Sequence, residues 1–250
     1  MENAKMFNPH VSVDCVLMTI VNDKLSVLLV ERKGQHGQAL GLKLPGGLIY
    51  QTEDLDEAAN RTLNDATGMK RVQLHQFRCF GSPMRTKNKE DVIWLESASN
   101  QKIMQAYQGS IRIITVAYLA LCKPDKKTAD SEYESKHWVA IDSLPRMPFD
   151  HNEIVNEAVK EIRLWIDREP AIVFNYLKKK FTASELRRTY EILYNKTLDV
   201  RNFHKKMKSW EYLLPTEDRK EGTAHRSPRY YRFDKIIYNK QRAKLNKNLE

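Results

Sequence analysis

The densest group of reactive side chains lies in residues 201–208, where helical spacing sorts them by chemistry. Phe203 and Met207 stand one helical turn apart and define an apolar face. The other positions carry guanidinium, amide, imidazole and ammonium groups, at Arg201, Asn202, His204, Lys205, Lys206 and Lys208. Such a helix fits the major groove of DNA, where arginine pairs with guanine, asparagine pairs with adenine and lysine neutralises phosphate. The pattern therefore predicts a helix that reads DNA.

Formal charge is distributed unevenly along the 250 residues, whose total is +10 at pH 7. Residues 1–170 hold 22 basic and 23 acidic side chains, a net charge of −1, whereas residues 171–250 hold 20 and 9, a net charge of +11. A compact basic region beside a neutral one favours a polyanionic partner, most often a nucleic acid. The alternative is a solvated lysine-rich surface, and the arrangement of the charges must decide between them.

A domain boundary is expected at 168–170, because proline disfavours helical geometry in the residue before it and is well suited to open the next helix. The domains are then 1–168 and 169–250. In the second, Thr182 and Glu185 have the capping-box spacing that starts a helix, and Asp199 is a good N-cap for the DNA-reading helix. Wing strands at 212–214 and 230–233 complete an α+β winged helix-turn-helix domain.

We expect DNA contacts from both helices and from the loop between the wing strands, which can straddle the backbone or enter the minor groove. The candidate DNA-binding residues are Thr182, Ser184, Arg187, Arg188, Arg201, Asn202, Lys205, Lys206, Lys208, His225, Arg226 and Arg229.

The first domain alternates strands and helices. A turn at Asn22-Asp23 joins β-branched strands at 11–20 and 25–31. A helix is expected from Asp54 to Thr67, with Gly68 as its stop. Further strands fit 72–81, 111–122 and 137–141, and a last amphipathic helix fits 151–166. This order predicts an α/β fold with a mixed sheet sandwiched by helices.

Part of this domain resembles the Nudix box over 23 residues. The resemblance rests on Gly47, Glu53, Arg61, Gly68 and Met69, together with the Pro-Gly-Gly turn that precedes them. In Nudix hydrolases this loop-helix-loop holds magnesium against a diphosphate, so the resemblance implies a Nudix-like fold with a ligand cleft. The matching and departing positions of the degenerate box are Gly47, Glu53, Glu57, Arg61, Thr62, Asp65, Ala66 and Gly68.

The departures concern the magnesium ligands. Thr62 stands where the hydrolase pattern has glutamate, and Asp65 and Ala66 stand where it has two adjacent glutamates. These positions share one helix face, which keeps a single carboxylate. Magnesium requires an octahedral set of oxygen ligands and activates the attacking water. We therefore expect no metal site, no catalytic residues and no cofactor.

Glu53 and Arg61 are expected to tie the loop to the helix, a structural role that needs no chemistry. Glu57 could instead pair with Arg61 as its i,i+4 neighbour along the helix.

The chain as a whole resembles Nudix-related transcriptional regulators. The similar segments are 180–186 and 198–203 in the second domain, and Arg112 before 116–118 and 148–151 in the first. The resemblance implies homodimers on palindromic operators and a small effector, either ADP-ribose or a related nucleotide, or a sugar; the missing carboxylates favour a sugar. The candidate ligand-binding residues are Arg32, Gly46, Gly47, Arg112, Asp150 and His151.

Several alternatives stay open. Asp150 can be a simple N-cap with His151 beside it, and residues 84–109 look like an insertion that weakens transfer of the ligand site. A hydrolase of ADP-ribose or a related nucleoside diphosphate is the second function, and an RNA or protein partner for the basic domain is the third. The 41% hydrophobic and 30% charged composition is typical of a globular protein. No apolar run approaches the roughly 20 residues of a membrane span, so we expect a cytoplasmic protein without a membrane partner.

Overall fold

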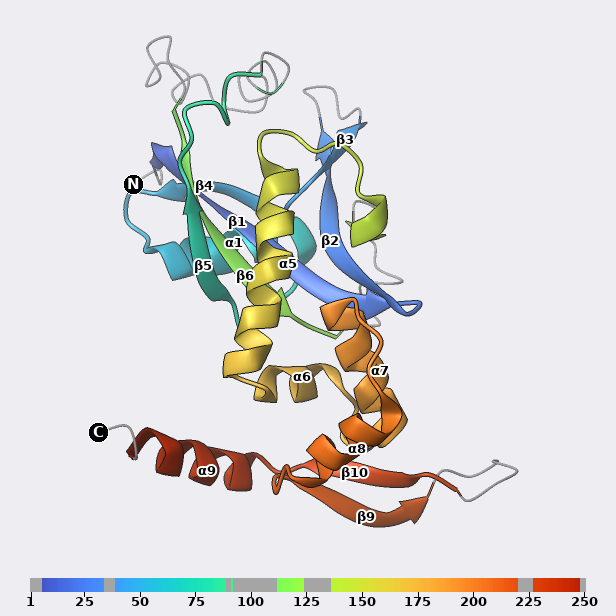
Figure 1. The fold of residues 1–250 in the computed structure, drawn as a ribbon. Coiled ribbons are helices and arrows are strands. Elements are labelled where there is room, and N and C mark those ends of the chain that lie inside the picture. Colours follow the sequence, from blue (N-terminus) through green and yellow to red (C-terminus); the bar gives the residue numbers. More distant parts are fainter. Residues whose placement is uncertain are drawn as a thin grey trace. The chain divides into compact units, whose positions relative to one another are not determined.

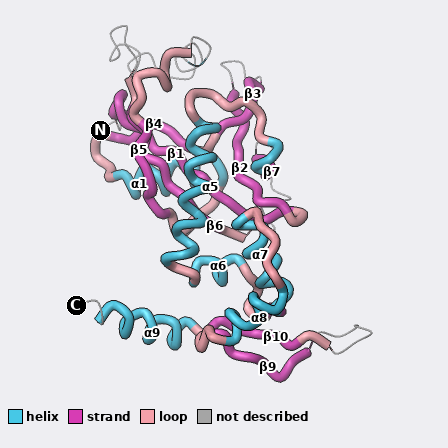
Figure 2. The backbone as a smooth tube through the Cα atoms, viewed as in Figure 1, coloured by secondary structure: helices cyan, strands magenta, loops and turns pink. Residues whose placement is uncertain are grey.

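The computed structural model describes residues 6–33, 39–88, 91, 112–123, 136–219 and 227–247, and Figures 1 and 2 show their elements. The chain divides into two compact units, unit 1 (Met1–Glu161) and unit 2 (Ile162–Glu250). The division lies within helix α5 (His151–Arg168), ahead of the junction expected at 168–170. Among the described helices, none is both long enough and apolar enough to cross a membrane.

The described part of unit 1 holds a mixed sheet, as the sequence predicts, and its seven strands include two, β3 and β4, beyond the five expected. Its long strand β1 pairs in parallel with β6 and antiparallel with β2 and β4, while β3 and β7 pair with β2, and β5 pairs with β6. The strands are β1 (Phe7–Val21), β2 (Lys24–Lys33), β3 (Ala39–Lys43), β4 (Gly46–Tyr50), β5 (His75–Phe80), β6 (Ile114–Leu121) and β7 (Lys136–Ala140).

Local turn chemistry fixes two of the connections in unit 1. Asn22 and Asp23 both take positive φ values, 48° and 61°, between the paired residues Val21 and Lys24. This is the geometry of a tight hairpin whose twist matches that of the strands. Gly68 ends α1 (Leu55–Thr67) with a φ of 68°, in the left-handed region that glycine adopts without strain.

Two helices cover the sheet of unit 1, with α5 in front and α1 behind in the view of Figure 1. Alternate β1 residues, Val13, Cys15 and Leu17, pack in the buried cluster that contains Ala58 and Leu63 of α1. The intervening β1 residues are buried as well. A strand covered on both faces shows a continuous apolar run instead of strict alternation, which is the pattern of residues 15–18, whereas Ser12, Asp14 and Thr19 are buried polar residues of the same strand.

Unit 2 is a winged helix whose core is rich in aromatic rings. Phe174 stacks on Phe233 with ring centroids 4.4 Å apart and on Phe181 at 5.7 Å. Three antiparallel strands pair in the order β8-β10-β9. The elements are α6 (Ala171–Tyr176), β8 (Phe181–Thr182), α7 (Ala183–Tyr194), α8 (Val200–Lys208), β9 (Leu213–Arg219), β10 (Arg229–Phe233) and α9 (Lys235–Lys247).

Two elements of unit 2, β8 and α9, are not predicted from the sequence. β8 has two residues, too few to carry a periodic pattern. α9 is dominated by lysine, asparagine and glutamine and shows only weak segregation of apolar and polar residues. In unit 1, β5 begins at His75 instead of residue 72.

Candidate ligand pocket and nucleic-acid interface

The loop before α1 is tied to the helix by the pair that the sequence predicts. Arg61 donates from Nε to Glu53 Oε2 at 2.9 Å and from Nη2 to Glu53 Oε1 at 2.5 Å, and Nη2 also reaches the backbone oxygen of Leu48 at 3.0 Å. The hydrogen bonds that Arg61 donates to Glu53 raise the pKa of Arg61. Glu57 instead closes a capping box with Asp54. Arg61 thus contacts Glu53 and not Glu57.

The helix face that holds magnesium in Nudix hydrolases is poor in carboxylates. The buried Thr62 donates its hydroxyl to backbone oxygens one turn earlier, at 2.9 and 3.2 Å. Asp65 is solvent-exposed and lies 3.7 Å from Arg61 Nη1, and Ala66 carries no ligand atom. Within the described ranges, no group of three or more histidine, cysteine, aspartate or glutamate side chains is arranged to hold a metal ion.

Gly46 and Gly47 lie in β4, opposite Asp14 and Val13 of β1. A Cβ atom at Gly46 would stand 2.2 Å from Asp14 Oδ1, so only glycine allows this close approach. At Gly47 a Cβ atom would meet Thr62 Cγ2 at 3.5 Å, an ordinary contact. Gly46 is thus required by the position of Asp14.

Asp14 is a buried carboxylate that is surrounded by polar side chains from three other segments. Thr115 donates its hydroxyl to Asp14 Oδ2 at 2.7 Å, and His151 Nε2 and Arg85 Nη2 lie 3.6 and 3.8 Å from the carboxylate. His151 Nδ1 accepts from the backbone nitrogen of Leu44 at 3.1 Å. Burial lowers the pKa of His151, and Asp14 opposes that shift. Because Nδ1 is an acceptor, the imidazole is neutral and its proton is on Nε2.

Arg85 connects this cluster to the start of α5. Its Nε and Nη2 donate to the two oxygens of Asp150, both at 2.9 Å, and its Nη1 donates to the backbone oxygen of Ile113 at 3.0 Å. The Arg85 side chain is 4% exposed. A buried, bidentate guanidinium–carboxylate pair of this kind holds both partners in one orientation.

A second ion pair fixes the residue before Asp150. Asp91 accepts from Arg32 Nη1 at 3.1 Å and from the backbone nitrogen of Phe149 at 2.8 Å. Phe149 has a φ of 54°, a strained value for a residue with a bulky side chain. Asp91 therefore stabilises a backbone conformation that Phe149 would not adopt by itself.

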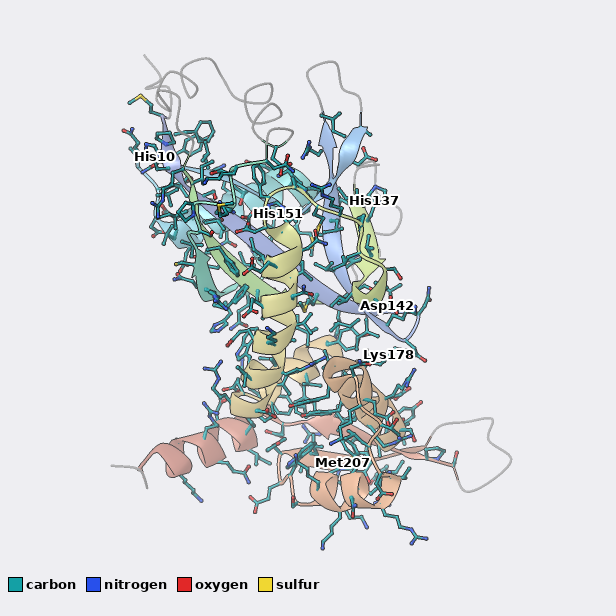
Figure 3. The ribbon with its side chains drawn as sticks, turned by 45° about the horizontal axis from the view of Figure 1, so that its top comes forward. His10, His137, Asp142, His151, Lys178 and Met207 are labelled. Carbon is teal, nitrogen blue, oxygen red and sulfur yellow. The ribbon has the colours of Figure 1, made fainter. Side chains whose placement is uncertain are left out.

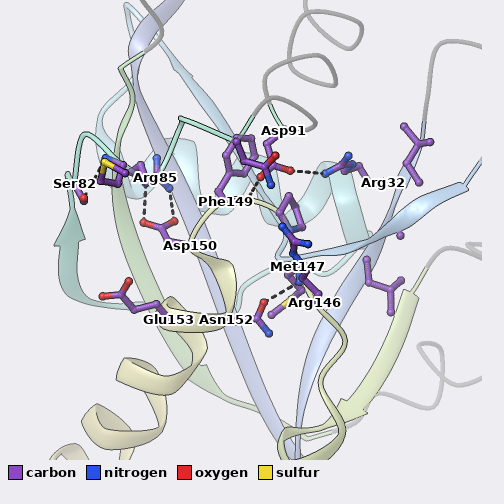
Figure 4. Close-up of a pocket in the computed structure, with 16 residues that line it drawn as sticks. Arg32, Ser82, Arg85, Asp91, Arg146, Met147, Phe149, Asp150, Asn152 and Glu153 are labelled. Carbon is purple, nitrogen blue, oxygen red and sulfur yellow. Dashed lines mark hydrogen bonds and ion pairs between the residues drawn. The ribbon is translucent and has the colours of Figure 1, made fainter.

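A pocket of about 490 Å³ opens beside these ion pairs (Figure 4). Its charged lining consists of Arg32, Arg85, Arg146, Asp91, Asp150 and Glu153. The lining thus holds three guanidinium groups and three carboxylates, so its formal charge is zero. Asn88 and Asn152 add amide groups to the lining.

The pocket contains only some of the predicted ligand-binding residues. Arg32 and Asp150 line it, whereas Gly46, Gly47 and His151 do not. Arg112 is also outside the lining; it is exposed and donates to the backbone oxygen of Gly81 at 3.3 Å.

The sequence-based reasoning missed Arg85 and Asp91. Both belong to residues 84–109, which the sequence presents as an insertion. Charged residues in a polar segment carry no periodic signal, and nothing in the sequence indicates that they pair with Asp150 and Arg32.

In unit 2, the start of α7 is a complete capping box. Thr182 Oγ1 accepts from the Glu185 backbone nitrogen at 3.2 Å, and the Glu185 carboxylate accepts from the Thr182 backbone nitrogen at 2.7 Å. Thr182 is buried and Ser184 is exposed. The Thr182 hydroxyl is thus committed to the helix cap.

The turn between α7 and α8 is held by the buried carboxylate of Glu191. It accepts from Arg187 Nη1 at 2.5 Å and from the backbone nitrogen of Leu198 at 2.9 Å, and Arg188 Nη1 lies 3.9 Å away. Arg187 is half-buried, so its guanidinium stabilises the turn, whereas Arg188 is exposed.

α8 carries the cationic face that its sequence predicts. Asp199 caps the helix by accepting from the Asn202 backbone nitrogen at 2.8 Å, and Phe203 and Met207 are buried. Figure 3 shows the side chains of this unit, with Met207 labelled in α8. The exposed polar and charged residues are Arg201, Asn202, Lys205, Lys206 and Lys208, and Val200 is exposed as well.

The wing strands β9 and β10 pair antiparallel, and Arg229 at the start of β10 is exposed. His225 and Arg226, two of the predicted DNA contacts, lie outside the described residues.

Two families of known proteins match the chain. Residues 8–160 match the NUDIX domain, and residues 173–233 match the family described as the NrtR DNA-binding winged helix domain. The ADPR responsive transcriptional repressor NtrR of Acinetobacter baylyi is 24% identical over 230 residues, which cover 90% of this chain and 82% of that protein.

Solved structures show the same two-part fold. Shewanella oneidensis NrtR in complex with a 27mer DNA is 22% identical, with a TM-score of 0.63 over 90% of this chain and 93% of that one. A MutT/nudix family protein from Enterococcus faecalis is 22% identical, with a TM-score of 0.61 over 94% of this chain and 90% of that one.

Proposed function

Because the chain belongs to the NUDIX family and carries a winged helix of the NrtR DNA-binding type, we propose that it is a metabolite-responsive transcriptional repressor. The observation that carries this proposal is the pairing of two features in one chain. Unit 2 exposes a cationic helix face on α8, and unit 1 has a Nudix helix with one exposed carboxylate at the magnesium positions. The first suits DNA, and the second suits binding of a ligand without its hydrolysis.

The DNA partner is a double-stranded, palindromic operator. α8 enters the major groove, where Arg201 and Asn202 contact base edges and the lysines neutralise phosphates. Two copies of the protein, related by a two-fold axis, place two such helices about one turn of DNA apart. The wing adds backbone contacts through Arg229 and through the predicted residues His225 and Arg226.

The NUDIX unit acts as a sensor and not as an enzyme. Magnesium needs several oxygen ligands, and at the box positions Asp65 alone offers a carboxylate, beside a guanidinium. The similar protein of Acinetobacter baylyi is named for its response to ADPR. The formal charges of the pocket lining sum to zero, which also suits a neutral sugar. The effector is therefore a sugar or an ADP-ribose-like nucleotide bound in the pocket.

Helix α5 is the element through which the effector acts. Asp150, directly before the helix, and Asn152 and Glu153 in its first turn line the pocket. Its last turns belong to unit 2, where Arg163 Nε donates to the Leu193 backbone oxygen at 3.1 Å and Asp167 accepts from the Tyr194 hydroxyl at 2.5 Å. A ligand that moves the start of α5 therefore acts on a helix that also contacts α7.

A thermal-shift screen with ADP-ribose, pentoses and sugar phosphates tests the sensor, with and without DNA. Arg146 lines the pocket and is exposed. Arg146→Ala removes a positive charge from the pocket, so it should weaken an anionic effector and leave a neutral sugar unchanged. Lys70→Ala, which removes an exposed charge outside the pocket, is the matched control. If none of these compounds stabilises the protein, the proposed effector classes are wrong.

Operator binding is tested on duplexes selected by the protein from a random library. Arg201→Ala and Asn202→Ala should each cost about 1–3 kcal/mol on the selected sequence and relax its specificity, whereas Lys206→Ala should weaken selected and random duplexes alike. Equal losses for all three variants on both duplexes would contradict base reading by α8.

The hydrolase alternative requires Asp65 and either Glu53 or Glu57 to assemble a metal site in a different geometry, and it is tested separately. Incubation of ADP-ribose with magnesium or manganese should release no nucleotide or phosphate. Clear turnover would show that the NUDIX unit is an enzyme.

A further inference from the structure

Helix α9 is a basic element of unit 2 that lies beyond the matched winged helix. The family match ends at residue 233, and α9 spans Lys235–Lys247. Its sequence contains Lys235, Lys240, Arg242, Lys244 and Lys247 and no acidic residue. Net positive charge without acidic partners is the usual property of a surface that binds a polyanion.

One side of α9 is attached to the rest of unit 2. Tyr238 is 5% exposed, donates its hydroxyl to Glu169 and lies 5.1 Å from the ring of Tyr212. Arg242 Nη2 pairs with Glu169 Oε2 at 3.3 Å, and Gln241 donates to Glu211 at 2.5 Å. These contacts come from both ends of the unit 2 sequence and hold α9 in a defined orientation.

The opposite side of α9 presents lysines with no function in the fold. Lys240 and Lys244 are exposed, and in the described part of the chain neither forms an ion pair. They are i,i+4 neighbours, an arrangement in which like charges destabilise a helix. Arg242, between them in sequence, has its guanidinium occupied by Glu169. The repulsion between Lys240 and Lys244 is relieved if an anion binds both.

The position of α9 within unit 2 suits the DNA backbone as that anion. In Figures 1 and 3, α9 and the wing extend from α8 to opposite sides. DNA bound by α8 continues in both directions, so cationic elements on either side of α8 can meet flanking phosphates. We propose that α9 is a second DNA-backbone contact, with Lys240 and Lys244 neutralising phosphates beside the site read by α8. This rests on the proposed function, because it needs unit 2 to bind DNA.

The test uses the double variant Lys240→Ala/Lys244→Ala in the full chain, because alanine preserves helix formation. Each phosphate contact contributes about −0.9 to the slope of log affinity against log salt concentration. The double variant removes two contacts from each bound copy, so the magnitude of the slope should fall by about 1.8 per copy, or about 3.6 for two copies on one operator, with equal fold-losses of affinity on selected and random duplexes. Lys70→Ala/Lys123→Ala removes two exposed charges from unit 1 and should leave the slope unchanged.

Duplex length gives a second readout. Trimming the DNA flanks should weaken the parent protein more than the double variant, because the variant keeps the contacts of the wing and has lost those of α9. An unchanged slope in the double variant, with steep salt dependence in the parent, would overturn the role of α9 while the repressor function stands. Failure of the parent to bind any duplex would instead refute the proposed function. A changed oligomeric mass of the variant with an unchanged slope would assign α9 to contacts between copies and overturn the proposal.

Discussion

Single side chains control the electrostatics of unit 1, and the buried imidazole of His151 has a measurable consequence. Burial lowers its pKa in the folded protein below the value of 6.5 that it has in an unfolded chain. As pH falls below that value, the unfolded chain binds a proton that the folded chain does not bind. The free energy of unfolding therefore falls, by at most about 1.4 kcal/mol per pH unit.

We predict that this acid-side loss is smaller in the His151→Gln variant, since a glutamine oxygen can still accept from Leu44 and does not titrate. The measurement is urea unfolding of both proteins from neutral pH down to about pH 5. His137→Gln, at a partly exposed imidazole, is the matched control and should retain the parent dependence. Equal pH dependence in parent and His151→Gln would mean that other groups cause the loss.

The magnesium ligands that the Nudix box lacks can be restored by substituting single residues. We predict that Thr62→Glu/Asp65→Glu/Ala66→Glu makes thermal stability depend on magnesium. The three introduced carboxylates share one helix face and repel one another, and position 62 is buried, where an unpaired carboxylate is costly. A bound cation removes both penalties. The variant should melt below the parent without magnesium and recover when it is added. Strong stabilisation of the parent by magnesium would show that the native box already binds the metal.

At the scale of elements, the ends of helices were the most predictable part of the fold. The capping box at Thr182, the cap at Asp199 and the stop at Gly68 were predicted, and each depends on residues no more than a turn apart; the capping box at Asp54 follows the same rule and was not predicted. Local rules of this kind can be read from sequence.

The capping box of α7 supplies a prediction that separates folding from DNA binding. Thr182→Ala removes the acceptor of the Glu185 backbone nitrogen and should destabilise the protein by about 1 kcal/mol. Thr182→Asp keeps a capping acceptor, so its unfolding free energy should stay near that of the parent. If the residue also approaches a phosphate, Thr182→Asp should nevertheless weaken DNA binding by charge repulsion. If Thr182→Asp binds DNA with the affinity of the parent, Thr182 caps the helix and does not approach a phosphate.

The features that escaped prediction depend on long-range pairing. β8 exists because Phe181 and Thr182 pair with β10, nearly 50 residues later. The pocket depends on Arg85 and Asp91, whose partners Asp150 and Arg32 lie more than 50 residues away. The Glu53–Arg61 pair was predicted from the resemblance to the Nudix box, whereas closeness in sequence alone also allowed Glu57 as the partner of Arg61. The sequence presented His151 as a ligand-binding residue or as the neighbour of an N-cap. Neither interpretation predicted its contact with Asp14, which is distant in sequence.

At the scale of the whole molecule, charge separates the two functions. The excess of basic residues lies entirely in residues 171–250, whereas the pocket lining is formally neutral. We predict that DNA affinity falls steeply with salt, with a slope of about −0.9 per phosphate contacted, while the affinity for a neutral effector changes little. Fluorescence anisotropy for DNA and calorimetry for the effector measure the two affinities over one salt series. Salt-insensitive DNA binding would contradict the phosphate contacts assigned to α8.

The unbroken course of α5 across the division between the units also affects how the protein can be cut. Proteases act on exposed, locally unfolded segments, and residues 151–168 form a single helix. Cleavage near residue 161 requires this helix to melt first. A fragment that ends or begins near residue 161 would leave backbone groups of α5 without their helical hydrogen-bond partners. Separately expressed halves would therefore each need a new cap on their part of α5 to keep it folded.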